Sequence, residues 1–265
     1  MDFMKVVCWN INGRSSNITD NAADFISENL QDNSEIIVFT EYTLSFGRLS
    51  KNLEELGYIT FSNLTKTREN GVLIGVKSED IEIKQVFNLC PSTDDMQPNF
   101  FGVQLKKDNE SINIIGTRIR VDTKQYKTDA ETNHDFKDRA RQSVNLLHQL
   151  DLNKIEGKII IVGDFNNGFY RENDKLSDYK NARRYFNYKM LKNMMNEKGF
   201  TAYTPKYGYS LENNLKYDHA FAKGLKVKQP RYDWTFTTPS SKKSTYEGKT
   251  VGYPDHAQLL LDIDF

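Results

Sequence analysis

The chain has 265 residues, of which 38% are apolar and 27% charged, so it can build one large domain with a sizeable core and is slightly short for two. Its formal net charge is zero, so overall charge points neither to nucleic acid nor to an anionic membrane. No stretch approaches the ~20 consecutive apolar residues of a membrane span, no secretory signal is visible at the start, and two cysteines are too few for a disulfide framework. We therefore expect a single domain over residues 1–265, cytoplasmic, with no membrane contact and no evident protein partner.

Ten apolar and β-branched runs, each bounded by turn residues, predict β-strands. They are Val6–Ile11, Ile36–Thr40, Tyr58–Asn63, Gly71–Val76, Ile81–Phe87, Phe100–Leu105, Ile112–Ile119, Lys158–Val162, Tyr217–Ala222 and Gln258–Ile263. Several are apolar throughout, which is typical of strands that are covered on both faces.

Four segments between these strands have the apolar spacing of helices: Asp20–Leu30, Phe46–Leu56, Phe136–Leu150 and Lys180–Lys198. Asp135 is expected to cap the third, after a polar loop over Asp129–Asp135. Strands outnumber helices, and the helices are scattered between strand pairs. This favours two packed sheets with helices outside, and propensity alone leaves another α/β fold open.

Five short segments place polar groups at or near the ends of predicted strands, where loops can gather them. They are Trp9–Gly13, Val38–Glu41, Ile159–Asn166, Lys216–Phe221 and Tyr253–Ala257. A carboxylate that ends a buried strand, as Glu41 does, suits Mg²⁺, and a charge such as Asp164 after an all-apolar strand needs a partner or a metal. Asp255-His256 before the last strand suggests a histidine that transfers protons near neutral pH. Taken singly, each segment could equally be a turn or a structural ion pair.

In this order, the five segments resemble the endonuclease/exonuclease/phosphatase superfamily. That family has a strand ending in W/F-N-x-x-G, a strand ending in Glu, then G-D-F-N, a late strand carrying Asp, and Ser/Pro-Asp-His near the C-terminus. The matching segments span residues 6 to 263. The resemblance implies an α/β (α+β) fold: a four-layer αββα sandwich of two mixed, mostly antiparallel sheets packed face to face, with helices outside.

The same resemblance implies roles for individual residues. Glu41 resembles the direct Mg²⁺ (or Mn²⁺) ligand, with Asn12 and Asp255 on the metal side. Asp164 resembles the carboxylate that orients or deprotonates the attacking water. The remaining catalytic positions are Asn10 and Asn166, amides for phosphate or water, and His256, which contacts the scissile phosphate and is held by Asp218.

One position departs from the family. The strand Ile112–Ile119 usually carries His or Tyr where this chain has Arg118. Arginine is always protonated and cannot act as a general acid, but it can clamp a phosphate with two parallel hydrogen bonds. We therefore count Arg118 among the catalytic candidates. His134, in the predicted loop, is a further candidate for the missing imidazole.

The segment Tyr179–Lys189 mixes four aromatic rings with four cations. Cations for phosphates and rings for bases are what a single strand or a distorted duplex requires, so Arg183, Arg184 and Lys189 are predicted to bind substrate. An amphipathic helix with solvated cations is the alternative. The favoured hypothesis is a Mg²⁺-dependent nuclease that cleaves DNA or RNA by in-line attack of water. A phosphatase of small metabolites or lipid headgroups and a catalytically silent binding module are the alternatives.

Overall fold

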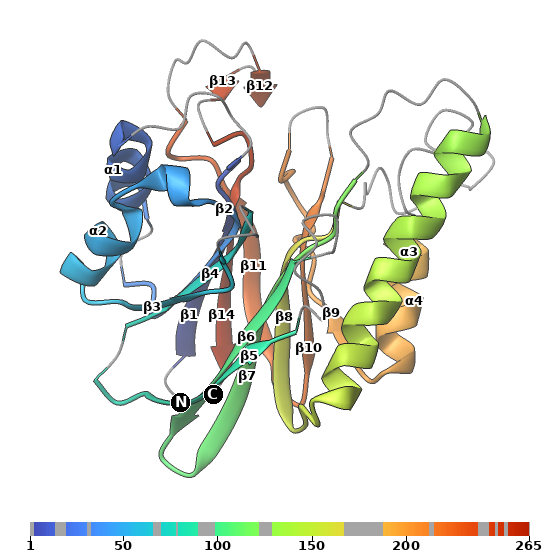
Figure 1. Cartoon of the computed structure of the whole chain (residues 1–265), viewed down its shortest axis with the longest axis horizontal. Helices are drawn as coiled ribbons and strands as arrows, with labels where there is room; N and C mark the ends of the chain where they lie inside the picture. The colour runs from blue at the N-terminus through green and yellow to red at the C-terminus, as the bar shows by residue number, and fades with distance from the viewer. Residues whose placement is uncertain are drawn as a thin grey trace.

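The structure is a computed structural model that describes residues 3–13, 20–30, 33–65, 70–77, 79–89, 99–121, 129–166, 188–211, 215–237, 244–246, 249–251 and 254–264. Two six-stranded sheets form its centre (Figure 1). The first has the order β11 (Val227–Asp233), β14 (Gln258–Asp264), β1 (Phe3–Asn10), β2 (Ile36–Tyr42), β4 (Gly71–Val76), β3 (Ile59–Ser62). The second has the order β5 (Glu82–Asn88), β6 (Asn99–Lys107), β7 (Glu110–Arg118), β8 (Lys158–Asp164), β10 (Asp218–Lys223), β9 (Thr201–Ala202).

Each sheet is mixed but mostly antiparallel. Among the strand pairs that the structure describes, β1–β2 and β7–β8 are parallel, and the others are antiparallel. A short hairpin of β12 (Ser244–Tyr246) and β13 (Lys249–Val251) lies apart from both sheets.

The helices cover the outer faces of the two sheets (Figure 1). α1 (Asp20–Glu28) and α2 (Leu49–Glu55) pack Ile26 and Leu53 against the first sheet, in one core with Phe39. α3 (Asp129–Leu152) and α4 (Tyr188–Glu197) pack apolar side chains against Ile161 of the second sheet. A third core lies between the sheets, so the predicted four-layer αββα sandwich is confirmed.

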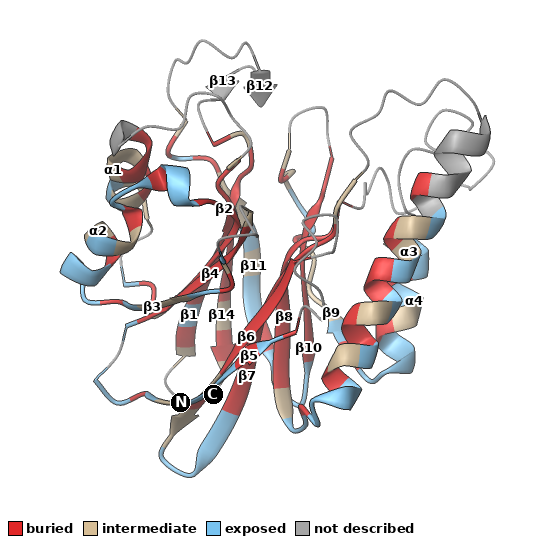
Figure 2. Cartoon of the chain, in the orientation of Figure 1, coloured by how far each residue is buried: buried red, intermediate tan, exposed pale blue. Residues whose placement is uncertain are grey.

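The inner strands are buried along most of their length (Figure 2). In β8, Ile160 and Val162 face the other sheet, whereas Ile159 and Ile161 face the helices. Both faces are therefore apolar, as the uninterrupted apolar run of this strand predicts.

All ten predicted strands are present, with bounds that differ by at most three residues from the predicted ones. β9, β11, β12 and β13 were not predicted. β11 is an edge strand whose register shifts between Lys228 and Arg231, around Pro230. Proline lacks the N–H of a ladder and is tolerated at sheet edges and bulges, so its presence hides such a strand in the sequence.

Two helix predictions were wrong in detail. The segment Phe46–Leu56 divides into a 3₁₀ turn, Leu44–Phe46, and α2, with Gly47 at positive φ between them. The third helix begins at Asp129, so residues 129–135 form no loop and Asp135 is no cap. Asp135 instead forms an ion pair with Arg139 one turn later, a spacing that supports a helix. The fourth predicted helix is described from Tyr188, and residues 180–187 lie outside the described residues.

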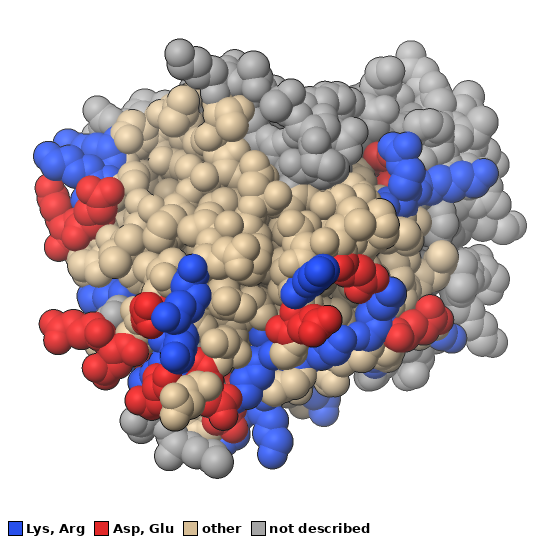
Figure 3. Space-filling model, turned by 60° about the horizontal axis from the view of Figure 1, so that its bottom comes forward, with Lys and Arg blue, Asp and Glu red and all other residues tan. Residues whose placement is uncertain are grey.

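The ends of the β1 and β8 strands lie at the upper end of the sandwich in Figure 1, and Figure 3 views the molecule from below. Basic and acidic side chains alternate over that lower face. The pair Lys158–Glu110, at the starts of β8 and β7, belongs to that end. No helix in the described part of the chain combines the length and apolar character of a membrane span.

Candidate active site

On the strand faces that pack between the two sheets, apolar side chains follow one another at every second residue, and polar residues lie where these rows of apolar side chains end. In β8 the row Ile160, Val162 is followed by Asp164, and in β10 the row Ala222, Ala220 is followed by Asp218. The two carboxylates lie opposite each other in the antiparallel β8–β10 register. The same alternation ends β1 at Asn10 and β7 at Arg118. We call the set the polar cluster; it comprises Asn10, Asn12, Glu41, Arg118, Asp164, Asn166, Asp218 and His256.

Glu41 joins the polar cluster because β2 is irregular. Simple alternation after Ile36 and Val38 would turn Thr40 toward the other sheet and Glu41 away from it. The β2–β4 register shifts between Thr40 and Tyr42, and Glu41 has φ 58°. A bulge of this kind re-aims a side chain, and the Glu41 carboxylate is 1% exposed and reaches the residues of β1 and β7.

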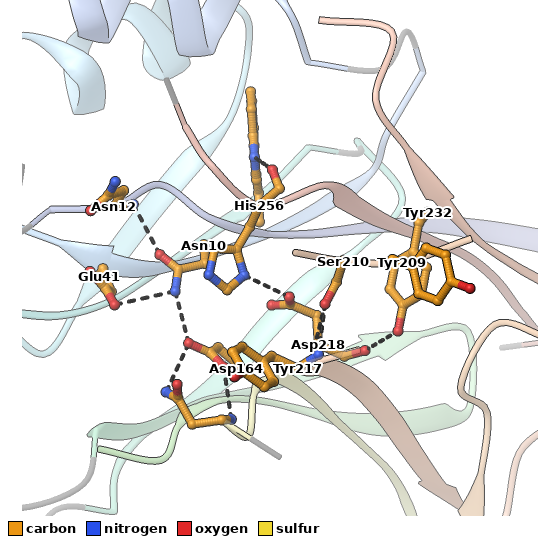
Figure 4. A network of polar contacts seen from close by, with 12 residues as sticks. Asn10, Asn12, Glu41, Asp164, Tyr209, Ser210, Tyr217, Asp218, Tyr232 and His256 are labelled. Atoms are coloured by element: carbon orange, nitrogen blue, oxygen red, sulfur yellow. Dashed lines mark hydrogen bonds and ion pairs between the residues drawn. The ribbon is translucent and has the colours of Figure 1, made fainter. Parts of the chain in front are cut away.

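Asn10 connects the two sheets (Figure 4). Its Nδ2 donates to Asp164 Oδ2 over 2.9 Å and lies 3.3 Å from Glu41 Oε1. Its Oδ1 accepts the backbone N–H of Asn12 over 2.9 Å. One amide therefore fixes the distance between the carboxylate of the first sheet and that of the second.

Asp164 is held from its other side by Asn166. The backbone N–H of Asn166 donates to Asp164 Oδ1 over 2.8 Å, and its Nδ2 donates to Asp164 Oδ2 over 3.0 Å. Asn166 has φ 47°, and Asn12 has φ 51°. With Glu41, three residues of the polar cluster have positive φ, a strained conformation that tends to gather at functional sites.

His256 and Asp218, which are 38 residues apart in sequence, lie in contact. His256 Nδ1 is 2.8 Å from Asp218 Oδ2, and both side chains are buried. The backbone of His256 is fixed by a β-bridge to Leu211 and by its carbonyl, which accepts the indole N–H of Trp9 over 2.9 Å. This contact fixes the orientation of the imidazole and leaves Nε2 as its other polar atom.

Burial and neighbouring charges shift the pKa values of His256 and Asp164 in the polar cluster. Burial opposes the charged imidazole, but the charge and hydrogen bond of Asp218, together with the charges of Asp164 and Asp255, raise the pKa of His256 to about 10. Burial and then the neighbouring Asp218 raise the pKa of Asp164 to about 6, against the lowering effect of His256 and Arg118. At neutral pH the site thus contains an imidazolium donor and a carboxylate of unusually high basicity.

No family model and no curated protein sequence matches the chain. Solved structures do match it in three dimensions. A D. rerio TDP2 humanised by 14 mutations superposes with a TM-score of 0.67 at 12% identity and covers 99% of both chains. The human Nocturnin catalytic domain with bound sulfate gives 0.60 at 15% identity, covering 99% of this chain and 94% of that one. ANGEL2, a 2′,3′-cyclic phosphatase, in complex with adenosine-2′,3′-vanadate gives 0.63 at 14% identity, covering 99% and 95%.

The chain therefore has the deoxyribonuclease I-like fold that these three structures share. The superposition covers nearly the whole chain, as the sequence resemblance does. In this fold, the five segments that carry the resemblance converge at one end of the sandwich.

The donor set of the polar cluster fits a magnesium ion better than a metal held by many protein ligands. In the described part of the chain, no group of three or more His, Cys, Asp and Glu side chains is arranged to hold a metal. Mg²⁺ keeps several waters and binds through one or two carboxylates. Glu41, with Asn12 beside it in Figure 4, is the carboxylate of the polar cluster that could hold such an ion. A buried oxygen, Asp218 Oδ1, also has no hydrogen-bond partner among the described residues, and a bound group or water would satisfy it.

Arg118, at the position where the superfamily that the sequence resembles has His or Tyr, lies in the polar cluster against Glu41. Its Nε and Nη2 lie 2.9 and 2.8 Å from Glu41 Oε1, and the side chains are 3% and 1% exposed. The structure therefore places the guanidinium on the proposed metal ligand. Its contact with a phosphate stays a prediction.

The remaining predicted positions lie outside these contacts. Asp255 is half-buried next to His256 and acts on its pKa by charge, so its role as a metal-side group stays a prediction. Lys189 is exposed in α4, whereas Arg183 and Arg184 lie outside the described residues. His134 belongs to α3 rather than to a loop, and its side chain lies outside the described part.

Two supporting residues, Ser210 and Arg139, were not identified from the sequence, and a third, Gly13, was given no role of its own. Ser210 Oγ accepts the backbone N–H groups of Tyr217 and Asp218 over 2.7 and 3.1 Å, while its carbonyl accepts the N–H of Ala257. Arg139, fully buried in α3, donates to the carbonyl of Asn166 over 2.7 Å. Gly13 lies so close to Glu41 that an added Cβ would be 1.8 Å from the Glu41 carbonyl oxygen. Gly13 belongs to the W-N-x-x-G segment, so this motif could have indicated its role. An isolated Ser or Arg in the sequence does not indicate a role in the site.

Replacing Ser210 with alanine is expected to lower kcat by roughly tenfold with KM nearly unchanged. The variant leaves two buried N–H groups without their acceptor, which costs about 1–3 kcal/mol each, and loosens Asp218 relative to His256. Steady-state kinetics and thermal unfolding would measure both effects. Ser143→Ala is the matched control, because Ser143 is equally buried but donates within α3. Unchanged kcat in Ser210→Ala would show that this serine does not position the pair.

Proposed function

We propose that the chain is a divalent-metal-dependent phosphoesterase, and specifically a nuclease that hydrolyses phosphodiester bonds of DNA or RNA. The observation that carries the proposal is the convergence of Glu41, Asp164 and the Asp218–His256 pair at one end of the inter-sheet core, joined by Asn10. The likeness of the fold to TDP2 in complex with a single-strand DNA product, with a TM-score of 0.64 at 11% identity, supports the substrate class.

We assign the metal to Glu41, with Asn12 and Asp255 on the metal side. When bound, Mg²⁺ or Mn²⁺ polarises the phosphate and neutralises the charge that develops on its oxygens. Glu41 is buried beside the amide of Asn10 and the guanidinium of Arg118, so a cation there is shielded from bulk water. Low local dielectric strengthens its attraction to phosphate.

Asp164 is proposed to orient the attacking water and accept its proton. Its oxygens are fixed by Asn10 and Asn166, and its pKa of about 6 makes it mostly ionised, yet a stronger base than an ordinary aspartate, at neutral pH. The water oxygen forms a bond to phosphorus as the bond to the leaving oxygen breaks on the opposite side. Both hydrogens of each Nδ2 are engaged, in Asn10 by Glu41 and Asp164 and in Asn166 by Asp164 and the carbonyl of Ile119, so a phosphate oxygen that binds either amide must replace one of these contacts.

His256 is proposed to stabilise the scissile phosphate. Since Asp218 binds Nδ1, Nε2–H of the imidazolium is the group that can donate to a non-bridging or leaving oxygen. Arg118 is proposed to add a second fixed positive charge. Its Nη1 is the part of the guanidinium that does not take part in the contacts with Glu41.

The substrate class can be tested with a panel of plasmid, single-stranded DNA, RNA and inositol phosphates, assayed in Mg²⁺ and in EDTA. We expect cleavage of a nucleic acid that EDTA abolishes, and a loss of at least about 100-fold in Glu41→Gln. Glu55→Gln, an exposed glutamate of α2, is the matched control. Activity that survives EDTA, or no loss in Glu41→Gln, would refute the proposal.

A second candidate, hydrolysis of small phosphoesters, is favoured by the likeness of the fold to ANGEL2, a 2′,3′-cyclic phosphatase. The two candidates share the polar cluster and differ in whether a surface binds the nucleic-acid backbone. If the protein hydrolyses the small phosphoesters and cleaves neither DNA nor RNA, the small-phosphoester candidate is the correct one.

Joint replacement of Arg183, Arg184 and Lys189 by glutamine is expected to weaken the binding of nucleic acid, and so to raise Kd, across sequences. It should also flatten the dependence of log K on log salt by roughly one unit of slope per lost phosphate contact. Binding assays across a salt series measure both. The matched control is Lys84, Lys107 and Lys154 to glutamine, since these lie at the opposite end of the second sheet. If the salt dependence of binding has the same slope in both triple variants, then Arg183, Arg184 and Lys189 do not contact the nucleic-acid backbone and are ordinary solvated side chains.

A further inference from the structure

The pair Arg118–Glu41 holds the carboxylate to which the metal is assigned. Three N–H donors converge on one oxygen, Glu41 Oε1: Arg118 Nε at 2.9 Å, Arg118 Nη2 at 2.8 Å and Asn10 Nδ2 at 3.3 Å. An oxygen with three donors at this distance has no room for a metal as well. A cation that binds Glu41 must therefore coordinate Oε2 beside the guanidinium or displace the guanidinium.

Neither partner of the pair can move away into water. Arg118 is 3% exposed and ends β7, where it is paired in register with Asp164 of β8 and Asn99 of β6. Glu41 is fixed by the bulge in β2 and by the close approach of Gly13. Arginine stays charged at every pH the protein tolerates, so its charge at this place is permanent.

We propose that Arg118 is a built-in counterion that sets the metal affinity of the site: it stabilises Glu41 in the metal-free protein and weakens the binding of a divalent cation at that carboxylate. The inference rests on the proposed function, since it takes Glu41 as the metal ligand. Two physical effects act in the same direction. A fixed positive charge repels an incoming cation at short range in a buried site, and a carboxylate already paired has less to gain from a metal.

The pair also explains how a buried carboxylate is tolerated without metal. An unpaired ionised glutamate with 1% exposure would be strongly destabilising. Arg118 neutralises it in place, so the metal-free protein keeps the bulge and the geometry of the polar cluster. The consequence is a site that stays assembled without a cation and takes one only at a raised concentration.

Calorimetric titration of the metal-free protein with MnCl₂ at pH 8 tests the proposal without any activity measurement. Arg118→Met is expected to bind Mn²⁺ at least about tenfold more tightly than the wild type, because the competing charge is gone. Arg118→Lys, which keeps the charge, should stay within a few-fold of the wild type. Arg141→Met, the loss of an exposed arginine in α3, is the control and should leave the affinity unchanged.

Thermal unfolding gives an independent readout. Without metal, Arg118→Met should unfold at a lower temperature than the wild type, and saturating Mn²⁺ should raise its midpoint by more than it raises that of the wild type. Arg118→Gln carries the same expectation if the methionine variant does not fold. Unchanged or weaker Mn²⁺ affinity in these variants would overturn the inference. If Glu41→Gln binds Mn²⁺ as tightly as the wild type does, the assignment of the metal to Glu41, on which the proposed function depends, is wrong instead.

Discussion

Replacing His256 with alanine is expected to lower kcat by at least about 100-fold, the typical cost of losing one proton-transfer or oxyanion group. The physical reason is the imidazolium: with its pKa at about 10, His256 is protonated at neutral pH and can donate to the phosphate. Steady-state kinetics on the substrate selected by the panel would measure the loss.

Two variants separate this role from folding. His256→Asn keeps an amide that can donate to Asp218 in place of Nδ1 but provides no imidazolium, so it should lose as much activity while keeping the fold. His148→Ala, an exposed histidine of α3, should keep full activity. Activity of either His256 variant within a few-fold of the wild type would rule out His256 as a catalytic group.

Replacing Arg139 with methionine is expected to destabilise the protein by about 3–5 kcal/mol, because it leaves the charge of Asp135 buried without its cation. Arg139 is 0% exposed and lies 2.6 Å from Asp135. Its second contact, to the carbonyl of Asn166, fixes the backbone that holds Asp164, so kcat should fall as well. Urea unfolding measures the stability change.

The exposed pair in the same helix provides the control. Arg141 of the Arg141–Asp138 pair is 79% exposed, so Arg141→Met should cost no more than about 1 kcal/mol. Adding Asp135→Leu to Arg139→Met should recover much of the lost stability, since replacing both members of a buried pair by apolar groups is often neutral. A cost for Arg139→Met as small as that for Arg141→Met would show that the buried pair contributes little.

The apolar alternation of the strands made most of the fold predictable. The uninterrupted apolar run of β8 predicts a strand that is buried on both faces, and the two-residue period then places Asp164 on the same face as Ile160 and Val162. The start of α3 and the edge strand β11 were not predictable in this way. The first is polar and shows no apolar period, and the second contains Pro230 within a bulge.

The residues of the candidate site came from motifs, but their contacts depend on long-range geometry. The bulge that turns Glu41 toward β1 and β7 is formed by pairing with β4, thirty residues later, and leaves no mark in the segment Val38–Glu41. Arg118 stood out because it departs from the superfamily pattern, yet its pairing with Glu41, 77 residues away, required the structure. Ser210 acts through its hydroxyl on two distant backbone groups, which no local pattern reveals.

The central claim, that the polar cluster is a divalent-metal phosphoesterase site, is tested most directly by anomalous diffraction from crystals soaked in MnCl₂. The account predicts an anomalous peak about 2.1 Å from a Glu41 carboxylate oxygen, with Asn12 and Asp255 nearby or bridged by water, and the loss of that peak in Glu41→Gln. Manganese bound only at surface carboxylates, with Glu41 still paired to Arg118 and no peak in the polar cluster, would contradict it.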